Sequence, residues 1–257
     1  MLTVTDLNKT YSSRRGDFTA VDGMSFDVAE GELFSIVGPS GAGKTTLLRC
    51  IAGLDTPTSG TVNFDGVTVD GPPREFAVVF QDYARSLLPW VSVRKNVELP
   101  LVKDGSTAAE REVRVTRALE EVGLADAAHK RPGQLSGGMQ QRVAIARAIA
   151  YRPKVLIMDE PFASVDAQTR ADLEDLLLRV RAETGTTIVF VTHDVDESIY
   201  LSDRVAVVTR SPSRVAEIVD VPLPQPRDQI ATKSLPEFAA LRAQVFARIR
   251  DMVRDAA

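Results

Sequence analysis

The sequence predicts an α/β fold with a mainly parallel sheet, an N-terminal antiparallel β part and an inserted helical subdomain. Short β-branched runs alternate with helical patterns along most of the chain, which is typical of parallel strands covered by helices. Near the N-terminus, residues 61–64 and 67–69 flank Asp65-Gly66, a dipeptide that favours a hairpin turn. Residues 83 to about 150 contain few strand patterns, so this stretch is the candidate insertion.

The core elements follow from apolar runs with the length of buried strands or the spacing of helices. We expect strands at residues 33–37, 155–158, 187–191 and 204–208. We expect helices at residues 44–53, which ends at Gly53, at 107–122 and at 167–183. Strands and helices therefore alternate, as a parallel sheet covered on its faces requires.

Two parts of different character divide the chain. A globular domain covers residues 2–225, with the helical insertion at about 83–150 inside it, and a C-terminal tail covers residues 226–257. Apolar residues of the tail recur at helical spacing, at Phe238, Leu241, Val245, Ile249 and Met252. Because amphipathic terminal helices usually pack on their own domain, we expect a docked helix here.

Composition argues against several classes of protein. A formal net charge of −4 argues against general binding to nucleic acid or anionic lipid, which needs clustered Lys and Arg. Cys50 is the only cysteine, so no intrachain disulfide is possible, and with His129 and His193 it gives no zinc-type cluster. No apolar run approaches the roughly 20 residues of a membrane span, and no secretory signal is visible. We expect a cytosolic chain that partners hold at any membrane.

Residues 38–45 match the pattern G-x-x-x-x-G-K-[ST] at every fixed position, between an apolar strand and a helix. The glycines let successive N–H groups point at phosphate oxygens, and the helix N-terminus adds a favourable dipole. Lys44 can reach the β- and γ-phosphates, and the Thr45 hydroxyl can coordinate Mg²⁺. The alternative is a glycine-rich turn with a chance lysine. The motif predicts a nucleotide-phosphate binder with a P-loop NTPase core, and leaves a kinase, a GTPase, a motor and a transporter subunit open.

A second motif places two acids after an apolar run. Residues 155–158 are followed by Asp159 and Glu160, and a buried parallel strand carries such acids to its C-terminal edge, where ligands bind. Asp159 is then placed to hold Mg²⁺, and Glu160 to polarise a water for attack on the γ-phosphate. The alternative is two exposed acids at a strand end.

Residues 135–141, Leu-Ser-Gly-Gly-Met-Gln-Gln, lie between these two motifs and resemble the signature sequence of ABC ATPases. Ser136 is a good helix N-cap, and Gly137 and Gly138 leave backbone N–H groups open to an anion. The resemblance implies a homodimer of two such subunits, arranged head to tail. In it, Ser136, Gly137, Gly138 and Gln140 of one subunit complete the ATP site of the other.

Further positions match landmarks of the same family. By resemblance, Tyr11 stacks on adenine, although it could be an ordinary strand aromatic, and Gln81 senses Mg²⁺ and the attacking water. His193 matches the histidine that contacts the γ-phosphate, and Asp166 matches an acid that crosses the dimer interface. Residues 164–165 are Ser-Val where the family more often has Ala-Leu, so contacts there are expected to differ.

The resemblance implies a Mg²⁺-dependent ATPase with ATP and Mg²⁺ as its cofactors. The residues expected to bind ATP are Tyr11, Gly38, Pro39, Ser40, Gly41, Ala42, Gly43, Lys44, Thr45, Thr46 and Gln81 in one subunit. Those expected to bind it from the partner are Ser136, Gly137, Gly138, Gln140 and Asp166. The expected metal ligands are Thr45, Gln81 and Asp159, and the expected catalytic residues are Glu160, His193 and Lys44.

Residues 87–90, Leu-Leu-Pro-Trp, resemble the nitrate, sulfonate and taurine importer branch of the family. The resemblance implies that transmembrane permease subunits contact the chain near Leu87, Leu88 and Trp90, with an extracytoplasmic solute-binding protein as an indirect partner. Trp90 is the only tryptophan, and a core residue of the helical subdomain is the alternative. The implied location is the cytoplasmic face of the membrane, as a peripheral subunit.

Two rival functions remain open at this point. The chain could serve an ABC exporter, or it could be a soluble ABC-type ATPase that acts on nucleic acid or ribosomes. The second is disfavoured because no tandem ATPase domain, long coiled-coil insertion or zinc module is visible. The transported solute is not encoded here, since specificity in this family resides in the partner proteins.

Overall fold

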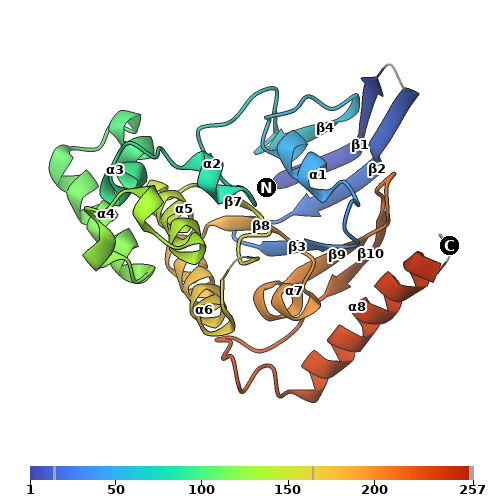
Figure 1. Ribbon diagram of the computed structural model, residues 1–257. Coiled ribbons are helices and arrows are strands. Elements are labelled where there is room, and N and C mark those ends of the chain that lie inside the picture. The colour runs from blue at the N-terminus through green and yellow to red at the C-terminus, as the bar shows by residue number, and fades with distance from the viewer. Residues whose placement is uncertain (14–15, 164, 255–257) are drawn as a thin grey trace. The chain divides into compact units, whose positions relative to one another are not determined.

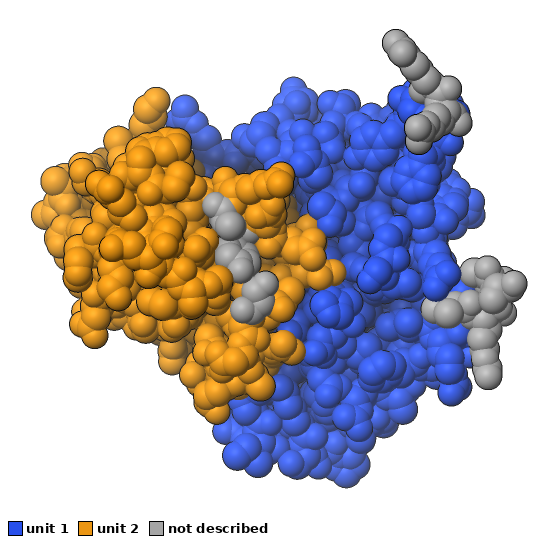
Figure 2. All heavy atoms as spheres, in the orientation of Figure 1, with its two compact units in different colours: residues 1–76, 187–257 blue, residues 77–186 orange. Residues whose placement is uncertain are grey.

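The structure is a computed structural model that describes residues 1–13, 16–163 and 165–254. The chain divides into two compact units, of which unit 1 holds residues 1–76 and 187–257 and unit 2 holds residues 77–186 (Figure 2). No helix in the described part of the chain is long and apolar enough to cross a membrane.

Unit 1 contains an antiparallel sheet with the strand order β2-β1-β4-β5 (Figure 1). Its strands are β1 (Leu2–Ser13), β2 (Gly16–Val28), β4 (Ser59–Phe64) and β5 (Val67–Thr68). Phe64 pairs with Val67 across the turn. Both turn residues, Asp65 and Gly66, have positive φ, which matches the twist of the flanking strands. The predicted hairpin is therefore confirmed.

A second sheet of unit 1 places four strands in the order β10-β9-β3-β8. They are β3 (Leu33–Val37), β8 (Thr187–Thr192), β9 (Arg204–Val208) and β10 (Val215–Asp220). β3 runs parallel to both β8 and β9, and β10 closes the edge antiparallel to β9. Every residue of β3 is buried, as expected for a central parallel strand covered on both faces.

Among its described residues, unit 1 contains the helices α1 (Lys44–Ile51), α7 (Val195–Leu201) and α8 (Pro236–Arg254). The helix predicted at 44–53 ends at Ile51, and Gly53 follows it with a φ of 67°. α8 is the helix expected in the tail. It buries Phe238 and Val245 and packs beside α7 (Figure 1).

Unit 2 is mainly helical between its two strands. Its strands are β6 (Phe76–Val79, whose first residue belongs to unit 1) and β7 (Val155–Asp159), which are neighbours. Its α-helices are α2 (Tyr83–Ser86), α3 (Val93–Glu98), α4 (Ala108–Glu121), α5 (Gly137–Tyr151) and α6 (Ala167–Thr184). Short 3₁₀ helices lie at Leu99–Lys103, Ala125–Ala127 and Pro132–Gln134. Residues 83–150 thus carry helices and no strand, as the sequence predicts.

Candidate functional site

The loop after β3 has glycine where a side chain would not fit. A Cβ atom on Gly38 would lie 2.6 Å from Val208 Cγ2, and one on Gly43 would lie 2.6 Å from the carbonyl oxygen of Ala20. Gly41 and Gly43 have φ of 75° and 80°, in the left-handed region that glycine adopts without strain. Glycine therefore specifies the tight turn that brings the chain from β3 into α1.

Lys44 is the first residue of α1, and its side chain is held by the loop itself. Its Nζ donates to the carbonyl oxygens of Gly38 and Pro39 at 2.8 and 3.0 Å, and the residue is buried. The first turn of α1 contains no acidic residue, so the helix places no negative side chain at the positive end of its own dipole. The Thr45 side chain next to it is exposed and Thr46 is half-buried. An ammonium and a helix N-terminus at one loop favour phosphate.

Tyr11 lies on β1 and is 40% exposed, and the side chains of Asp55 and Lys9 contact it. Its hydroxyl donates to Asp55 Oδ2 at 3.3 Å, and Asp55 also accepts from Arg49 Nε of α1 at 2.8 Å. The hydrogen bond from Arg49 holds the pKa of the Asp55 carboxyl below its usual range. Lys9 Nζ lies 5.0 Å from the ring centroid of Tyr11. Sequence reasoning missed Asp55 and Arg49, which connect the candidate adenine-stacking residue to the helix of the phosphate loop.

His193 lies at the end of β8, between two residues that are tied to α7. Thr192 Oγ1 donates to the buried Glu197 carboxylate at 2.6 Å. The Asp194 carboxylate accepts from the backbone N–H groups of Asp196 and Glu197 at 2.9 and 3.2 Å and so caps α7. His193 itself is exposed. The turn that presents this side chain is therefore anchored on both sides.

In unit 2, β7 ends at Asp159, which is buried, and Glu160 follows it. Glu160 has a φ of 46°, a left-handed conformation that costs energy for a residue with a side chain. Its Oε2 accepts a hydrogen bond of 3.2 Å from Gln81 Nε2. The two residues are 79 positions apart in sequence, and they meet because β6 and β7 are neighbouring strands. The structure thus brings the predicted base and the predicted glutamine together.

The loop before α5 presents the residues that resemble the family signature. Ser136 caps the helix, since its Oγ accepts from the backbone N–H of Met139 at 3.3 Å. Ser136 and Gly137 are exposed. The amide of Gln140 donates to the carbonyl oxygens of Pro132 and Leu135 at 3.1 and 3.3 Å, so within this chain it holds the loop in shape.

Asp166 is the exposed N-cap of α6. Its carboxylate accepts from the backbone N–H of Thr169 at 3.0 Å and from the Thr169 hydroxyl at 2.7 Å. The backbone hydrogen bond from Thr169 holds the pKa of Asp166 below its usual range, with the hydroxyl adding to the effect. Ser164, the departure from the family pattern noted in the sequence, lies outside the described residues.

The segment 87–90 ends in an exposed tryptophan. Trp90 is 68% exposed, so the interpretation of it as a core residue is wrong. Leu87 is buried and Leu88 half-buried, so both support the loop more than they offer surface. Sequence reasoning missed the importance of Asn96, which is fully buried and accepts from the Leu88 backbone N–H at 2.8 Å while its own amide donates to the Leu88 carbonyl oxygen at 3.1 Å.

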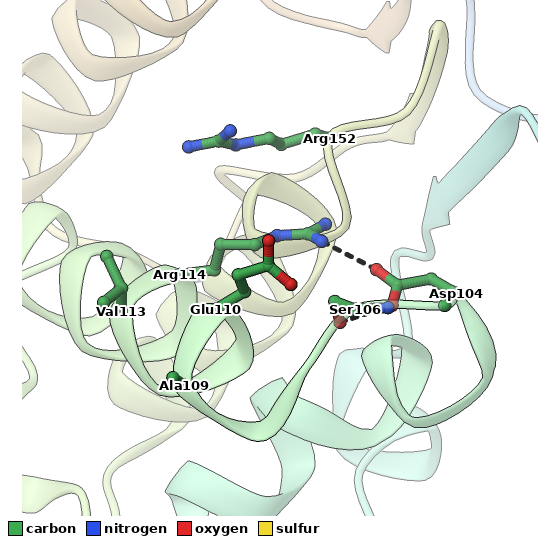
Figure 3. Close-up of a pocket in the computed structure, with 8 residues that line it drawn as sticks. Asp104, Ser106, Ala109, Glu110, Val113, Arg114 and Arg152 are labelled. Atoms are coloured by element: carbon green, nitrogen blue, oxygen red, sulfur yellow. Dashed lines mark hydrogen bonds and ion pairs between the residues drawn. The ribbon is translucent and has the colours of Figure 1, made fainter.

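A hollow of about 640 Å³ opens on unit 2 (Figure 3). None of the residues that line it is among the predicted ATP-binding residues. Its lining residues are Asp104, Gly105, Ser106, Ala109, Glu110, Val113, Arg114 and Arg152. Arg114 of α4 donates to the Asp104 carboxylate at 2.7 Å and to the carbonyl oxygen of Ala150 at 2.6 Å, which ties the end of α5 to the loop that precedes α4. These contacts within the unit give the arginine a structural role.

The predicted site residues therefore form two sets. The set in unit 1 consists of Tyr11, the phosphate loop at residues 38–46, and His193. The set in unit 2 consists of Gln81, Asp159, Glu160, the residues 136–140 and Asp166. The expected Mg²⁺ ligands, Thr45, Gln81 and Asp159, offer a hydroxyl, an amide and a carboxylate, the hard oxygen donors that Mg²⁺ prefers. Among the described residues, no group of three or more His, Cys, Asp or Glu side chains could hold a metal ion.

Comparisons with known proteins show the family to which the chain belongs. The family described as ABC transporter matches residues 21–163, more than half of the chain. The chain is 44% identical to the nitrate transport protein NasD of Klebsiella oxytoca, over 95% of this chain and 94% of that protein. It is 43% identical to the nitrate import ATP-binding protein NrtD of Synechococcus elongatus, over 93% and 87% of the two chains.

Other relatives extend the comparison. The bicarbonate transport ATP-binding protein CmpC of Synechocystis is 44% identical over 94% of this chain, which spans 37% of the length of that protein. Among solved structures, the dimeric ATP-binding cassette MJ0796, in a post-hydrolysis state bound to ADP and Pi, superposes with a TM-score of 0.79 at 33% identity. That match covers 86% of this chain and 99% of the other. The comparisons favour the importer prediction over the exporter and the soluble alternative.

Proposed function

Because the chain belongs to the ABC transporter family, as an ATP-binding and ATP-hydrolysing subunit, we propose that it energises the import of a small inorganic anion, nitrate or bicarbonate. The observation that carries this proposal is its similarity, over nearly its full length, to a nitrate transport protein. The exposed Trp90 in the segment that resembles this branch supports it. Sulfonates and taurine, which the sequence also suggests, stay predictions.

The residues of unit 1 bind the nucleotide in this proposal. The phosphate loop at 38–46 wraps the β- and γ-phosphates, and Lys44 turns its ammonium from the loop carbonyls to the phosphate oxygens. Tyr11 stacks on the adenine ring, in the orientation that its hydrogen bond to Asp55 selects. His193 contacts the γ-phosphate from the end of β8.

The residues of unit 2 act on the water. Glu160 accepts a hydrogen bond from the attacking water and takes its proton, while Gln81, 3.2 Å from the Glu160 carboxylate, orients it. Thr45, Gln81 and Asp159 would hold Mg²⁺, which would supply positive charge to the phosphates when bound. The strained backbone of Glu160 supports this assignment, because strain of this kind gathers at functional positions.

Two copies of the chain complete each other's sites in this proposal. The cap of α5, where Ser136 and Gly137 are exposed and Gly138 is half-buried, meets the γ-phosphate held by the opposite copy. Gln140 shapes that cap through the carbonyls before it, and Asp166 faces the partner across the interface. The solved dimer of a similar cassette supports a homodimer.

The permease contact belongs to the exposed loop around Trp90. An exposed indole on a loop fixed by the buried Asn96 presents a rigid anchor for a helix of a membrane partner. The chain then works at the cytoplasmic face of the membrane as a peripheral subunit. A solute-binding protein outside the cytoplasm delivers the anion to the permease and contacts this chain only indirectly.

Co-purification of the chain with its partners, followed by a transport assay in vesicles, tests this function. The tagged chain is isolated from gently solubilised membranes, its partners are identified by mass spectrometry, and the complex is placed in vesicles with ATP on the side of the chain. We expect a multi-span permease to co-purify and labelled nitrate or bicarbonate to accumulate when ATP is present. The same complex with Lys44→Ala should show no ATP-driven accumulation. Recovery of soluble partners alone would overturn the transporter assignment. ATP-driven flux in the opposite direction would make the protein an exporter subunit.

A further inference from the structure

The C-terminal tail contacts the helix that follows His193, and these contacts all lie within unit 1. α7 begins two residues after His193, and both chain neighbours of this histidine are tied to its first turn. Thr192 bonds the Glu197 carboxylate, and Asp194 accepts from the backbone N–H groups of Asp196 and Glu197. A displacement of α7 is therefore transmitted directly to the backbone of His193.

Arg227 holds the other end of α7. This arginine is buried, and its guanidinium donates to the carbonyl oxygens of Ile199, Tyr200 and Ser202 at 3.1, 2.6 and 2.7 Å. The last carbonyls of a helix have no partner within the helix and carry partial negative charge. The planar guanidinium satisfies several of them at once, which the point charge of a lysine cannot do.

The tail adds two further contacts with α7, one from Arg242 on α8 and one from Lys233 in the segment before α8. Arg242 Nη1 lies 3.6 Å from Asp196 Oδ2 in the first turn of α7, and Lys233 Nζ lies 4.5 Å from the ring centroid of Tyr200 near its end. Phe238 and Val245 bury the apolar face of α8, which packs beside α7 (Figure 1). Basic side chains of the tail thus meet α7 at both of its ends.

We propose that residues 227–254 form a clamp on α7 that positions His193, with Arg227 and Arg242 as positioning residues. Arg227 fixes the end of α7, and Arg242 fixes its beginning, so the ring of His193 keeps one place at the end of β8. Neither arginine acts on the nucleotide itself. The effect of the clamp on catalysis rests on the role proposed for His193, whereas its effect on the position of His193 does not.

The chain offers a matched pair of variants. Arg242 and Arg248 are both on α8, are 48% and 46% exposed at the side chain, and form ion pairs of 3.6 and 3.5 Å. Arg242 pairs with Asp196 of α7, whereas Arg248 pairs with Glu217 of β10. Arg242→Ala therefore removes a clamp contact, and Arg248→Ala removes a similar contact that does not touch α7. Arg227→Lys tests the buried contact while keeping the charge.

The readout of position is NMR of the full chain with ¹³C-labelled histidine. The chain has only two histidines, His129 and His193, and His129 lies in unit 2 as an internal reference. We expect Arg242→Ala and Arg227→Lys to shift the His193 signal and leave the His129 signal in place, with Arg248→Ala moving neither. Equal shifts for Arg242→Ala and Arg248→Ala, or no shift of His193 in any variant, would overturn the clamp. A shift of both histidine signals in Arg242→Ala would mean that the variant loosens the whole fold, and it would also overturn the clamp.

ATPase kinetics then separate the clamp from the role of His193. We expect kcat to fall about tenfold in Arg227→Lys and about twofold in Arg242→Ala, with KM for ATP unchanged, as for coupling through a connected element. Suppose that His193→Ala lowers kcat, and that Arg227→Lys and Arg242→Ala shift the His193 signal but keep the parent kcat. This result would overturn the effect of the clamp on catalysis. If His193→Ala keeps the parent kcat, the role proposed for His193 fails and the positional clamp stands. If Arg227→Lys does not fold, the Arg242 and Arg248 pair decides the question.

Discussion

Two strand ends of the molecule reach left-handed backbone in opposite ways. After β3 in unit 1, the residues with positive φ are Gly41 and Gly43, for which this conformation carries no steric cost. After β7 in unit 2, the residue with positive φ is Glu160, at 46°. A glutamate in this conformation is strained by about 1–2 kcal/mol, because Cβ crowds the following carbonyl oxygen.

The difference reflects which part of the residue is used at each strand end: backbone N–H groups after β3 and a side-chain carboxylate after β7. The phosphate loop offers N–H groups, a close approach and a helix end, and glycine supplies the first two better than any other residue. In the proposed mechanism the end of β7 must place a carboxylate next to the attacking water, and the structure places the Glu160 carboxylate 3.2 Å from the Gln81 amide. The strain at Glu160 is therefore expected wherever the side chain cannot be given up.

The largest expected effect is at the strained end. Glu160→Gln keeps the shape and removes the charge, so we expect kcat for ATP hydrolysis to fall about 10²–10⁴-fold, as for loss of a general base. ATP binding, measured by fluorescent nucleotide titration, should stay within about twofold because the residue does not hold the phosphates. The variant should also accumulate as an ATP-dependent dimer in gel filtration. Rapid turnover by Glu160→Gln would show that another residue activates the water.

The phosphate loop gives the next effect, and two of its glycines form a matched pair. Ala at Gly43 brings both an unfavourable φ and a Cβ atom 2.6 Å from the Ala20 carbonyl oxygen, whereas Ala at Gly41 meets no atom within 4 Å. We expect Gly43→Ala to lower the free energy of unfolding by about 3 kcal/mol and Gly41→Ala by about 1 kcal/mol. Urea denaturation measures both. Equal losses would mean that the close approach at Gly43 relaxes without cost.

How far the sequence predicts this molecule depends on whether a feature is local. The phosphate loop, the acids after β7 and the cap of α5 are continuous motifs, so spacing alone finds them. Strands such as β3 are found from apolar runs for the same reason. The hairpin at Asp65 needs only a turn signal between two short strands.

Features that join distant residues leave no such pattern. Arg227 reaches the carbonyls of α7 from about 25 to 28 positions away, and Gln81 meets Glu160 across 79 positions. Nothing in the sequence distinguishes Asn96, which is buried, from an exposed asparagine, or decides whether Trp90 is buried. The strain at Glu160 has no local signal either, since glutamate rarely adopts that conformation.

A smaller effect comes from relieving the strain. Glu160→Gly removes the strain of the left-handed conformation, about 1–2 kcal/mol. Glycine also loses more backbone entropy on folding, at a cost of about 0.5–1 kcal/mol, so we expect the free energy of unfolding to rise by about 1 kcal/mol. Glu160→Ala is the control, because it loses the carboxylate but keeps the strain. Both variants should be inactive as ATPases. A Glu160→Gly chain no more stable than Glu160→Ala would mean that the backbone there relaxes when the side chain is cut.

The smallest effect is expected at Asp55, a side chain that supports Tyr11 and α1. The effect is small because the backbone of the glycine-rich loop, and not its side-chain contacts, determines the conformation of that loop. Asp55→Asn weakens the link from Arg49 to Tyr11, and we expect KM for ATP to rise about twofold with kcat unchanged.

Arg49 holds the Asp55 pKa below its usual range, so this pair stabilises the fold above the unfolded pKa of about 4 and loses its effect as pH falls through the lower folded value. The melting temperatures of parent and variant should therefore differ at pH 7 and converge at strongly acidic pH. A large loss of ATP binding in Asp55→Asn would mean that side chains, as well as glycines, order the phosphate loop, and the contrast between the two strand ends would then be one of degree.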